Sequence, residues 1–240
     1  MSLHPTARTA AATLAALVCC MSTAWAEEAP QPTPNHPSPS TCTYKSYQWH
    51  VEKKRSVNHQ SVTKPYAEVG ADERDPDEPR CSVCEEDQVS ISLSDLGAPG
   101  LGTIQVCHVF EAQVRAALQT IIADPDFDII DIVGYRPGKT RGKIIDAMRS
   151  EWSNHSFGTA IDINAARNGL YGACRITSLS PQALAKCKLR IGGAWDPDKH
   201  PRTTITPDSV VYRAFTAFWK WGGEISGDTR DLMHFSISGY

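Results

Sequence analysis

The chain has 240 residues and a nearly balanced charge, with 24 Lys and Arg against 27 Asp and Glu and a formal net charge of −3. This balance excludes a strongly basic surface for nucleic acid, and no run of like charges predicts attachment to a membrane surface. The length suffices for one medium-sized domain, or for one domain with an additional arm.

The first 26 residues are typical of a secretory signal peptide. Arg8 supplies the positive charge, residues 9–21 are mostly apolar, and Ala24-Trp25-Ala26 offers a cleavage site. The apolar run is shorter than the roughly 20 residues that a membrane-spanning helix needs. We therefore expect a periplasmic or secreted protein without a membrane span after cleavage. Lipidation at Cys19 or Cys20 is a weaker alternative, because no small residue fits well before either.

Residues 27–41 are rich in proline and poor in apolar side chains, which predicts a linker. An even number of cysteines in an exported chain favours disulfides. Cys174 and Cys187 bracket a short segment and are candidates for a local disulfide, and the other four are expected to tie an N-terminal arm, residues 42–103, to the core. Cys81-x-x-Cys84 could instead be half of a zinc site, although no second pair has matching spacing. The six disulfide candidates are Cys42, Cys81, Cys84, Cys107, Cys174 and Cys187.

Alternating apolar and aromatic residues predict a hairpin or edge strands within residues 43–69, and another strand at 89–93. The core domain, residues 104–240, would begin with a strand at 104–107. Apolar residues then recur at helical spacing over 109–122, and Asp124-Pro125 ends that helix.

Residues 128–134 predict a buried strand that delivers Arg136 to a cleft, although a surface arginine in a turn is the commoner case on position alone. Residues 139–150 predict a short helix or loop, with Ile144, Ile145 and Met148 facing inward. Near the C-terminus, residues 206–208 predict a helix start, and glycines at 222–223 its end.

Two distant segments together carry two imidazoles and two carboxylates. A zinc hydrolase needs three protein ligands, an open coordination position and a carboxylate that handles the proton. His155, Asp162 and His234 suit the ligand roles. Asp231, three residues before His234, can be the general acid/base. Arg136 would neutralise the charge that develops on the oxyanion.

Each of these pairs also has a simpler explanation. A histidine and an aspartate seven residues apart occur by chance in many chains, as does Asp-x-x-His. His155 could be a surface histidine, Asp162 a capped or paired aspartate, and His234 a core histidine between Met233 and Phe235.

The residues around these pairs favour the zinc interpretation. Ser153-Asn154-His155-Ser156-Phe157-Gly158-Thr159-Ala160-Ile161-Asp162 resembles the Ser-x-His-x-x-Gly-x-Ala-x-Asp signature of the zinc D-alanyl-D-alanine peptidase family. That family includes vancomycin-resistance D,D-peptidases and phage L-alanyl-D-glutamate endolysins, and it shares a fold with the hedgehog signalling domain. Trp221-Gly222-Gly223-x7-Asp231-x-Met233-His234-Phe235 resembles its second signature, and Gly134-Tyr135-Arg136 its arginine motif.

The resemblance covers roughly residues 104–240 and implies an α+β fold of the hedgehog and D,D-peptidase type. A small antiparallel sheet would carry the site on one face, with helices packed on the other. The roles that it implies are Zn²⁺ ligands at His155, Asp162 and His234, an acid/base at Asp231, an arginine on the scissile carbonyl at Arg136, and substrate-binding positions at Ser153 and Trp221.

Aspartate at 231 and the preceding Trp-Gly-Gly are similar to the endolysin-like branch. This favours an L-Ala–D-Glu-type endopeptidase acting on peptidoglycan peptides, and we separately expect the protein to be a monomer. A D-Ala-D-Ala carboxypeptidase is one alternative, and a zinc-containing binding module without turnover is another. The presence of both Asp231 and Arg136 argues against the binding module. The span from Arg136 to His155 is shorter than is usual in the family, and residues 42–103 have no counterpart there.

Overall fold

The computed structural model describes Met1 and residues 39–240, so the predicted signal peptide and most of the predicted linker lie outside the described residues. All the elements below belong to residues 39–240. Within 39–240 the fold is α+β, with four small sheets rather than the one predicted. No helix in this described part has the length and apolarity to cross a membrane. The α-helices are α1 (Glu111–Ala123), α2 (Pro181–Leu184) and α3 (Val210–Thr216).

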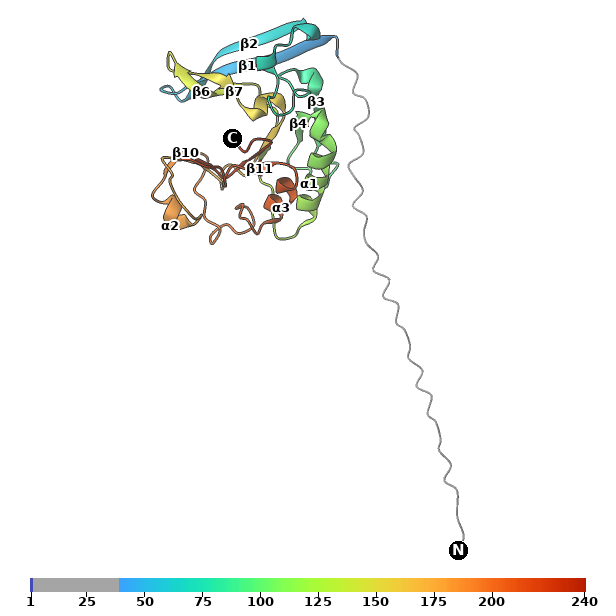
Figure 1. Ribbon diagram of the computed structural model, residues 1–240, viewed down its shortest axis with the longest axis vertical. Helices are drawn as coiled ribbons and strands as arrows, with labels where there is room; N and C mark the ends of the chain where they lie inside the picture. Colours follow the sequence, from blue (N-terminus) through green and yellow to red (C-terminus); the bar gives the residue numbers. More distant parts are fainter. Residues whose placement is uncertain (2–38) are drawn as a thin grey trace. The chain divides into compact units, whose positions relative to one another are not determined.

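An antiparallel sheet with the strand order β11-β13-β8-β5 lies at the centre of the candidate site. Its pairing puts His234 directly opposite Asp162 and Phe235 opposite Ile161. Side chains alternate between the faces of a strand, so Phe235 and Ile161 share the face opposite to His234 and Asp162. Phe235 packs on Phe215 of α3, with ring centroids 5.1 Å apart, and α3 lies beside α1 (Figure 1). The strands are β5 (Ile132–Val133), β8 (Ala160–Ile163), β11 (Lys220–Trp221) and β13 (His234–Ser236).

A second sheet, of order β2-β1-β6-β7, joins the N-terminal arm to the residues that follow Arg136. The predicted hairpin within 43–69 is present as β1 and β2. β1 runs parallel to β6 at Gln48 and Lys139 and antiparallel to β7 at His50 and Met148. The two hairpins therefore lie side by side (Figure 1). The strands are β1 (Thr41–His50), β2 (Arg55–Pro65), β6 (Lys139–Ile145) and β7 (Met148–Trp152).

The prediction of a short helix or loop at 139–150 is wrong, because these residues form the β6–β7 hairpin. Ile145 pairs with Met148 around a two-residue turn, Asp146-Ala147. Both turn residues have positive φ, 49° and 62°, which is the geometry of a type I′ turn. Asn-Gly is the usual sequence signal for that turn. Asp-Ala is not, so the sequence does not predict the turn here. Ile144 and Ile145 do not face inward but are 54% and 58% exposed.

The prediction of a buried strand over 128–134 also needs correction. Only Ile132 and Val133 are in a strand, and this edge strand pairs with β8 alone. Ile130 and Val133 are exposed. The segment before the strand is held by polar contacts, since the Ile130 N–H donates to Asn164 Oδ1 at 2.7 Å and the Ala165 N–H donates to Asp131 Oδ1 at 3.0 Å.

The helix predicted from 206–208 to the glycines at 222–223 is shorter than expected. α3 begins after Ser209, whose hydroxyl accepts the Tyr212 N–H, and it ends at Thr216. The remaining sheets are β3 (Gln88–Ser92) with β4 (Thr103–Cys107), and the order β10 (Lys188–Ile191), β9 (Leu170–Gly172), β12 (Arg230–Asp231). Short 3₁₀ helices are η1 (Tyr66–Glu68), η2 (Ala71–Glu73), η3 (Glu85–Asp87), η4 (His108–Phe110) and η5 (Asn154–Phe157).

Three disulfides join the six cysteines of the described region. Cys174 pairs with Cys187, the pair whose short spacing favoured a local bond. Cys81–Cys107 ties the arm to β4, whereas Cys42–Cys84 lies within the arm. Both cysteines of Cys81-x-x-Cys84 are therefore disulfide-bonded, and the alternative of a zinc half-site is wrong.

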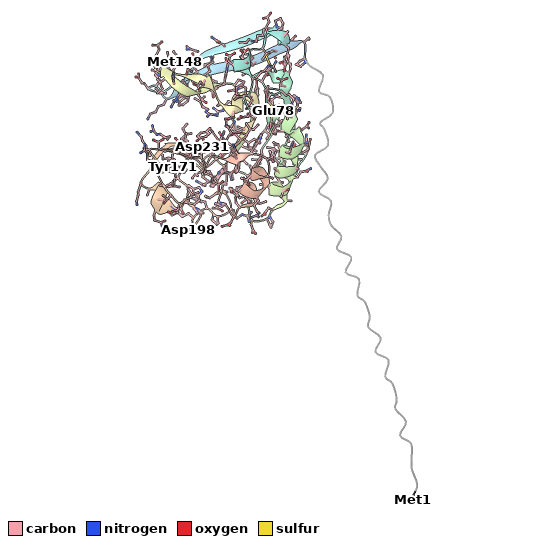
Figure 2. The ribbon with its side chains drawn as sticks, in the orientation of Figure 1. Met1, Glu78, Met148, Tyr171, Asp198 and Asp231 are labelled. Carbon is pink, nitrogen blue, oxygen red and sulfur yellow. A yellow bond between two sulfur atoms is a disulfide. The ribbon has the colours of Figure 1, made fainter. Side chains whose placement is uncertain are left out.

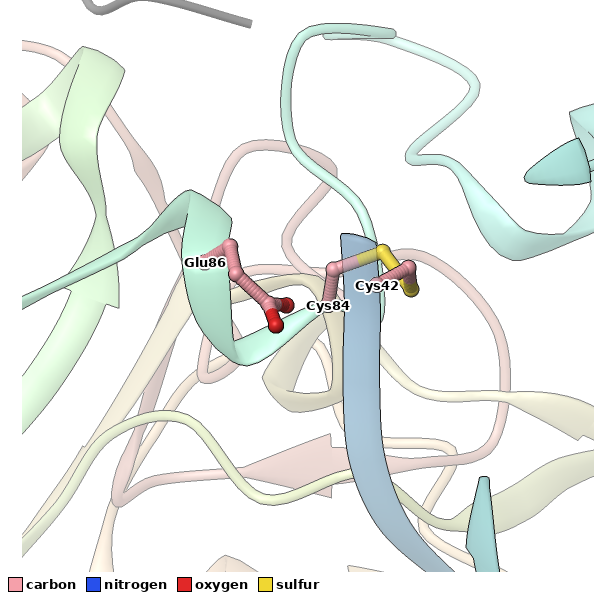
Figure 3. A group of neighbouring side chains, drawn as sticks. All are labelled: Cys42, Cys84 and Glu86. Atoms are coloured by element: carbon pink, nitrogen blue, oxygen red, sulfur yellow. A yellow bond between two sulfur atoms is a disulfide. The ribbon is translucent and has the colours of Figure 1, made fainter. Parts of the chain in front are cut away.

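Glu86 lies close to the Cys42–Cys84 disulfide (Figure 3). Its carboxylate accepts the Thr43 N–H and the Thr43 hydroxyl, both at 2.8 Å. The bonded sulfurs have no thiolate to offer a metal. This cluster therefore anchors the start of β1 and is not a metal site.

Candidate metal centre

His155, Asp162 and His234 form one compact group, although 79 positions separate the first from the last. Each offers a potential ligand atom, and these atoms lie within 4.8 Å of one another. His155 Nε2 lies 3.1 Å from Asp162 Oδ2, and His234 Nδ1 lies 2.9 Å from Asp162 Oδ1. Both imidazoles are almost completely buried. The three predicted ligands are therefore brought together on the sheet face opposite to α3.

The protonation of His155 is fixed by its second ring nitrogen. Nδ1 lies 2.8 Å from the carbonyl oxygen of Gly134, and only an N–H can donate to a carbonyl. In the neutral imidazole, Nε2 then carries a lone pair, and it lies 3.1 Å from Asp162 Oδ2. It has no hydrogen-bond partner among the described residues despite its proximity to the carboxylate. Two electron-rich atoms this close need a positive charge between them, either a proton or a metal ion, so this pair fits a metal ion.

His234 complements this arrangement from β13. Its Nδ1 lies within hydrogen-bond distance of Asp162, and its Nε2 is buried without a hydrogen-bond partner in the described region. Two imidazoles and one carboxylate form the donor set that three-ligand catalytic zinc sites use, leaving a position open for water or substrate. The residues present therefore fit a zinc ion.

The charge of the group is set by Asp162, whose side chain is 15% exposed. Burial opposes ionisation of this carboxyl, but the adjacent imidazoles of His155 and His234 outweigh burial and hold its pKa well below the usual range. Asp162 is thus an anion at every pH at which the protein is expected to work. An anion between two imidazoles attracts a divalent cation.

His155 is positioned by a short turn and by the segment that carries Arg136. It lies in η5, which is followed by Gly158 with φ of 69°, a conformation that glycine adopts without strain. The Arg136 N–H donates to the His155 carbonyl at 2.8 Å, while Gly134 accepts from the His155 ring. The Gly-Tyr-Arg segment therefore fixes both the backbone and the imidazole of the first ligand.

The guanidinium of Arg136 reaches the edge of the group and is 43% exposed. Nη2 lies 4.0 Å from Asp162 Oδ2. Nη1 donates to the hydroxyl of Tyr47 at 2.6 Å. The sequence analysis missed Tyr47, which belongs to β1 in the arm, because no local motif links a hairpin tyrosine to an arginine 89 positions later.

Asp231 lies in β12 opposite Leu170 of β9, and Figure 2 labels Asp231 and the neighbouring Tyr171 of β9. Its Oδ1 is buried and has no hydrogen-bond partner among the described residues. Burial raises the pKa of Asp231 to about 7, and the charge of Asp162 adds to this, while His234 and Arg136 act in the opposite direction. A carboxyl with a pKa near neutrality can both accept and return a proton.

The two predicted substrate-binding residues lie in different surroundings. Ser153 is buried directly before η5, with its hydroxyl 3.5 Å from that of Ser156. Trp221 is 2% exposed, and its indole N–H donates to the Leu232 carbonyl at 3.0 Å. Because Trp221 pairs with Phe235, it shares the sheet face that packs on α3. Trp221 therefore packs on the sheet face opposite to the metal group, where it supports the strand of His234. A substrate contact of Ser153 stays a prediction.

Comparison with known proteins agrees with this geometry. Residues 147–237 match the family model described as D-alanyl-D-alanine carboxypeptidase. The matched stretch contains His155, Asp162, Asp231 and His234, whereas Arg136 and Tyr47 precede it. No curated protein and no solved structure matched the chain. The family match supports a relationship to the peptidases of this superfamily.

Proposed function

We propose that the protein is an exported zinc metallopeptidase that hydrolyses stem peptides of peptidoglycan, as an endopeptidase of the L-Ala–D-Glu type. The observation that carries the proposal is the buried His155–Asp162–His234 group with Asp231 beside it, within a stretch that matches a peptidase family. Peptidases of this family are typically zinc-dependent. The three disulfides support export, because such bonds persist in oxidising compartments.

The proposed roles follow from the positions of the side chains. His155, Asp162 and His234 would hold the metal, which supplies a Lewis acid for the carbonyl and lowers the pKa of water. Asp231 accepts the proton of the attacking water and returns it to the leaving amine. Arg136 donates to the oxygen on which negative charge develops, and its partly exposed guanidinium is accessible to a substrate.

D-Ala-D-Ala carboxypeptidase activity is the second candidate. It is favoured by the description of the matched family model, whereas aspartate at position 231 and the Trp-Gly-Gly sequence favour the endopeptidase. Both reactions need the same metal group and the same acid/base. They differ in whether the substrate ends at the residue after the cleaved bond.

The decisive experiment incubates the oxidised, zinc-loaded protein with defined peptidoglycan fragments and identifies the products by mass spectrometry. A cut between L-Ala and D-Glu supports the endopeptidase, and loss of a terminal D-Ala supports the carboxypeptidase. Asp231→Ala is the control, and we expect it to bind zinc but to form no product. A folded, zinc-bound wild type without any product would overturn the proposal in favour of a binding module without turnover.

A further inference from the structure

We infer that the N-terminal hairpin contributes a positioning residue to the peptidase site: Tyr47 holds the guanidinium of Arg136 in its catalytic orientation. The inference rests on the proposed function, and it assigns a role in that function to an arm that lies outside the stretch matching the peptidase family. Three features of the structure carry it, namely a bulge in the hairpin, close packing on Gly138, and the charge balance around Arg136.

The hairpin is irregular at Tyr47. The register runs from Ser46 opposite Gln60 to Gln48 opposite Val57, so two residues of β2, Asn58 and His59, lie opposite the single residue Tyr47. This is a β-bulge, a device that redirects side chains and occurs often beside active sites. Asn58 adopts positive φ, 52°, as one residue of such a bulge can. His59 packs on the Tyr47 ring with centroids 5.9 Å apart, which fixes the ring from the hairpin side.

On its other side the Tyr47 ring packs against the loop that follows Arg136. A methyl group at position 138 would lie 2.5 Å from the ring carbon that bears the hydroxyl, so only glycine permits this approach. Gly138 is in turn bonded to η5, because its N–H donates to the Ser156 hydroxyl, and that hydroxyl donates to the Gly138 carbonyl, both at 3.0 Å. Tyr47 thus contacts the same short loop that packs on the helix of His155.

The hydrogen bond from Arg136 to Tyr47 matters most when a metal is bound. Within the described residues, the guanidinium of Arg136 contacts the Tyr47 hydroxyl at 2.6 Å and the Asp162 carboxylate at 4.0 Å, and its charge also acts on the Asp231 carboxyl. A divalent cation held by Asp162 would offset the charge of that carboxylate and weaken its attraction for the guanidinium. The neutral phenol is unaffected by this offset. Tyr47 is therefore the partner that keeps Arg136 in place in the metal-loaded enzyme.

The first test compares kcat and KM of Tyr47→Phe with those of the wild type on a peptide that the wild type cleaves. We expect kcat to fall on the order of 10-fold with little change in KM, since a hydrogen bond to a charged group that acts at the transition state is lost. In an Arg136→Met background the same substitution should cost nothing more, because Tyr47 acts through Arg136. An unchanged kcat, or a loss that adds fully to that of Arg136→Met, would overturn the inference.

Tyr44→Phe is the matched control. It removes a hydroxyl from the same strand, one that donates to Glu73 at 2.8 Å and does not contact Arg136. This variant should show the wild-type kcat even if its melting temperature falls. If Tyr44→Phe lowers kcat as much as Tyr47→Phe does, the hairpin would affect catalysis only through the stability of the fold, and not through a contact with Arg136.

A second readout needs no substrate and separates this inference from the proposed function. Phenylglyoxal modifies accessible guanidinium groups, and peptide mass spectrometry locates the modified residue. In zinc-loaded protein we expect Arg136 to react several-fold faster in Tyr47→Phe than in the wild type or in Tyr44→Phe. Equal rates would overturn the positioning role. If the wild type cleaves no peptide but Arg136 still reacts faster in Tyr47→Phe, the positioning role of Tyr47 stands and the peptidase function is refuted.

Discussion

The stretch that matches the peptidase family and the N-terminal arm contribute to one site in different ways. Residues 147–237 carry the proposed metal ligands on two paired strands and one short turn, with His234 directly opposite Asp162. The arm carries no ligand, but it contacts this machinery at several points. Tyr47 binds Arg136, and Asp75 accepts the Thr159 hydroxyl at 2.5 Å. The chemistry is thus concentrated in short segments, and its support comes from a distant part of the chain.

If the matched stretch alone binds the metal, the largest effect should come from its central carboxylate. We expect Asp162→Ala to weaken zinc binding at least about a hundredfold and to lower hydrolysis at least about a thousandfold. Zinc content by mass spectrometry and kcat/KM on the same samples measure both. Asp128→Ala is the control, because Asp128 is exposed and pairs only with Arg202 in the described structure. Full zinc content in Asp162→Ala would place the metal elsewhere.

Removing two different disulfides distinguishes a loss of site support from a loss of overall stability. Cys81–Cys107 closes a span of 26 positions, and Cys174–Cys187 one of 13. Removing either by double alanine substitution should cost about 3 kcal/mol of unfolding free energy in urea. Only the first should also lower kcat/KM, because the Cys107 N–H donates to the carbonyl of Gly158, at the end of the turn that carries His155. Equal activity of the two variants would contradict a supporting role for the arm.

The smallest effect concerns Asp231 in the metal-free protein. Its folded-state pKa of about 7 lies above the ordinary value of 3.8, so the unfolded chain releases this proton at a lower pH than the folded one. Stability is therefore lost as the pH rises from about 4 to about 7. Asparagine cannot ionise, and we expect Asp231→Asn to gain on the order of 2 kcal/mol at pH 8. Denaturation at pH 4 is the internal control, and a gain of the same size there would exclude this cause.

The sequence supports the prediction of this site because its chemistry is local. The residues around His155, Asp162 and His234, which resemble the signatures of a peptidase family, identify the candidate ligands, and the structure brings these three together. Alternation likewise predicts the first hairpin, and helical spacing predicts α1. Backbone geometry is harder to predict, because the turn at Asp146-Ala147 has positive φ without a glycine. The role of Tyr47 depends on a β-bulge and on a contact with Arg136, 89 positions later, and no short sequence pattern predicts such a contact.

Anomalous diffraction at the zinc absorption edge, from crystals of the zinc-saturated protein, tests the central claim most directly. We predict one zinc peak per chain, at ligand distances of about 2.0–2.2 Å from His155, Asp162 and His234. The assignment of Nε2 as the His155 ligand atom would be checked in the same map. A saturated crystal whose zinc peaks all lie away from these three residues would contradict the metal centre and the peptidase built on it.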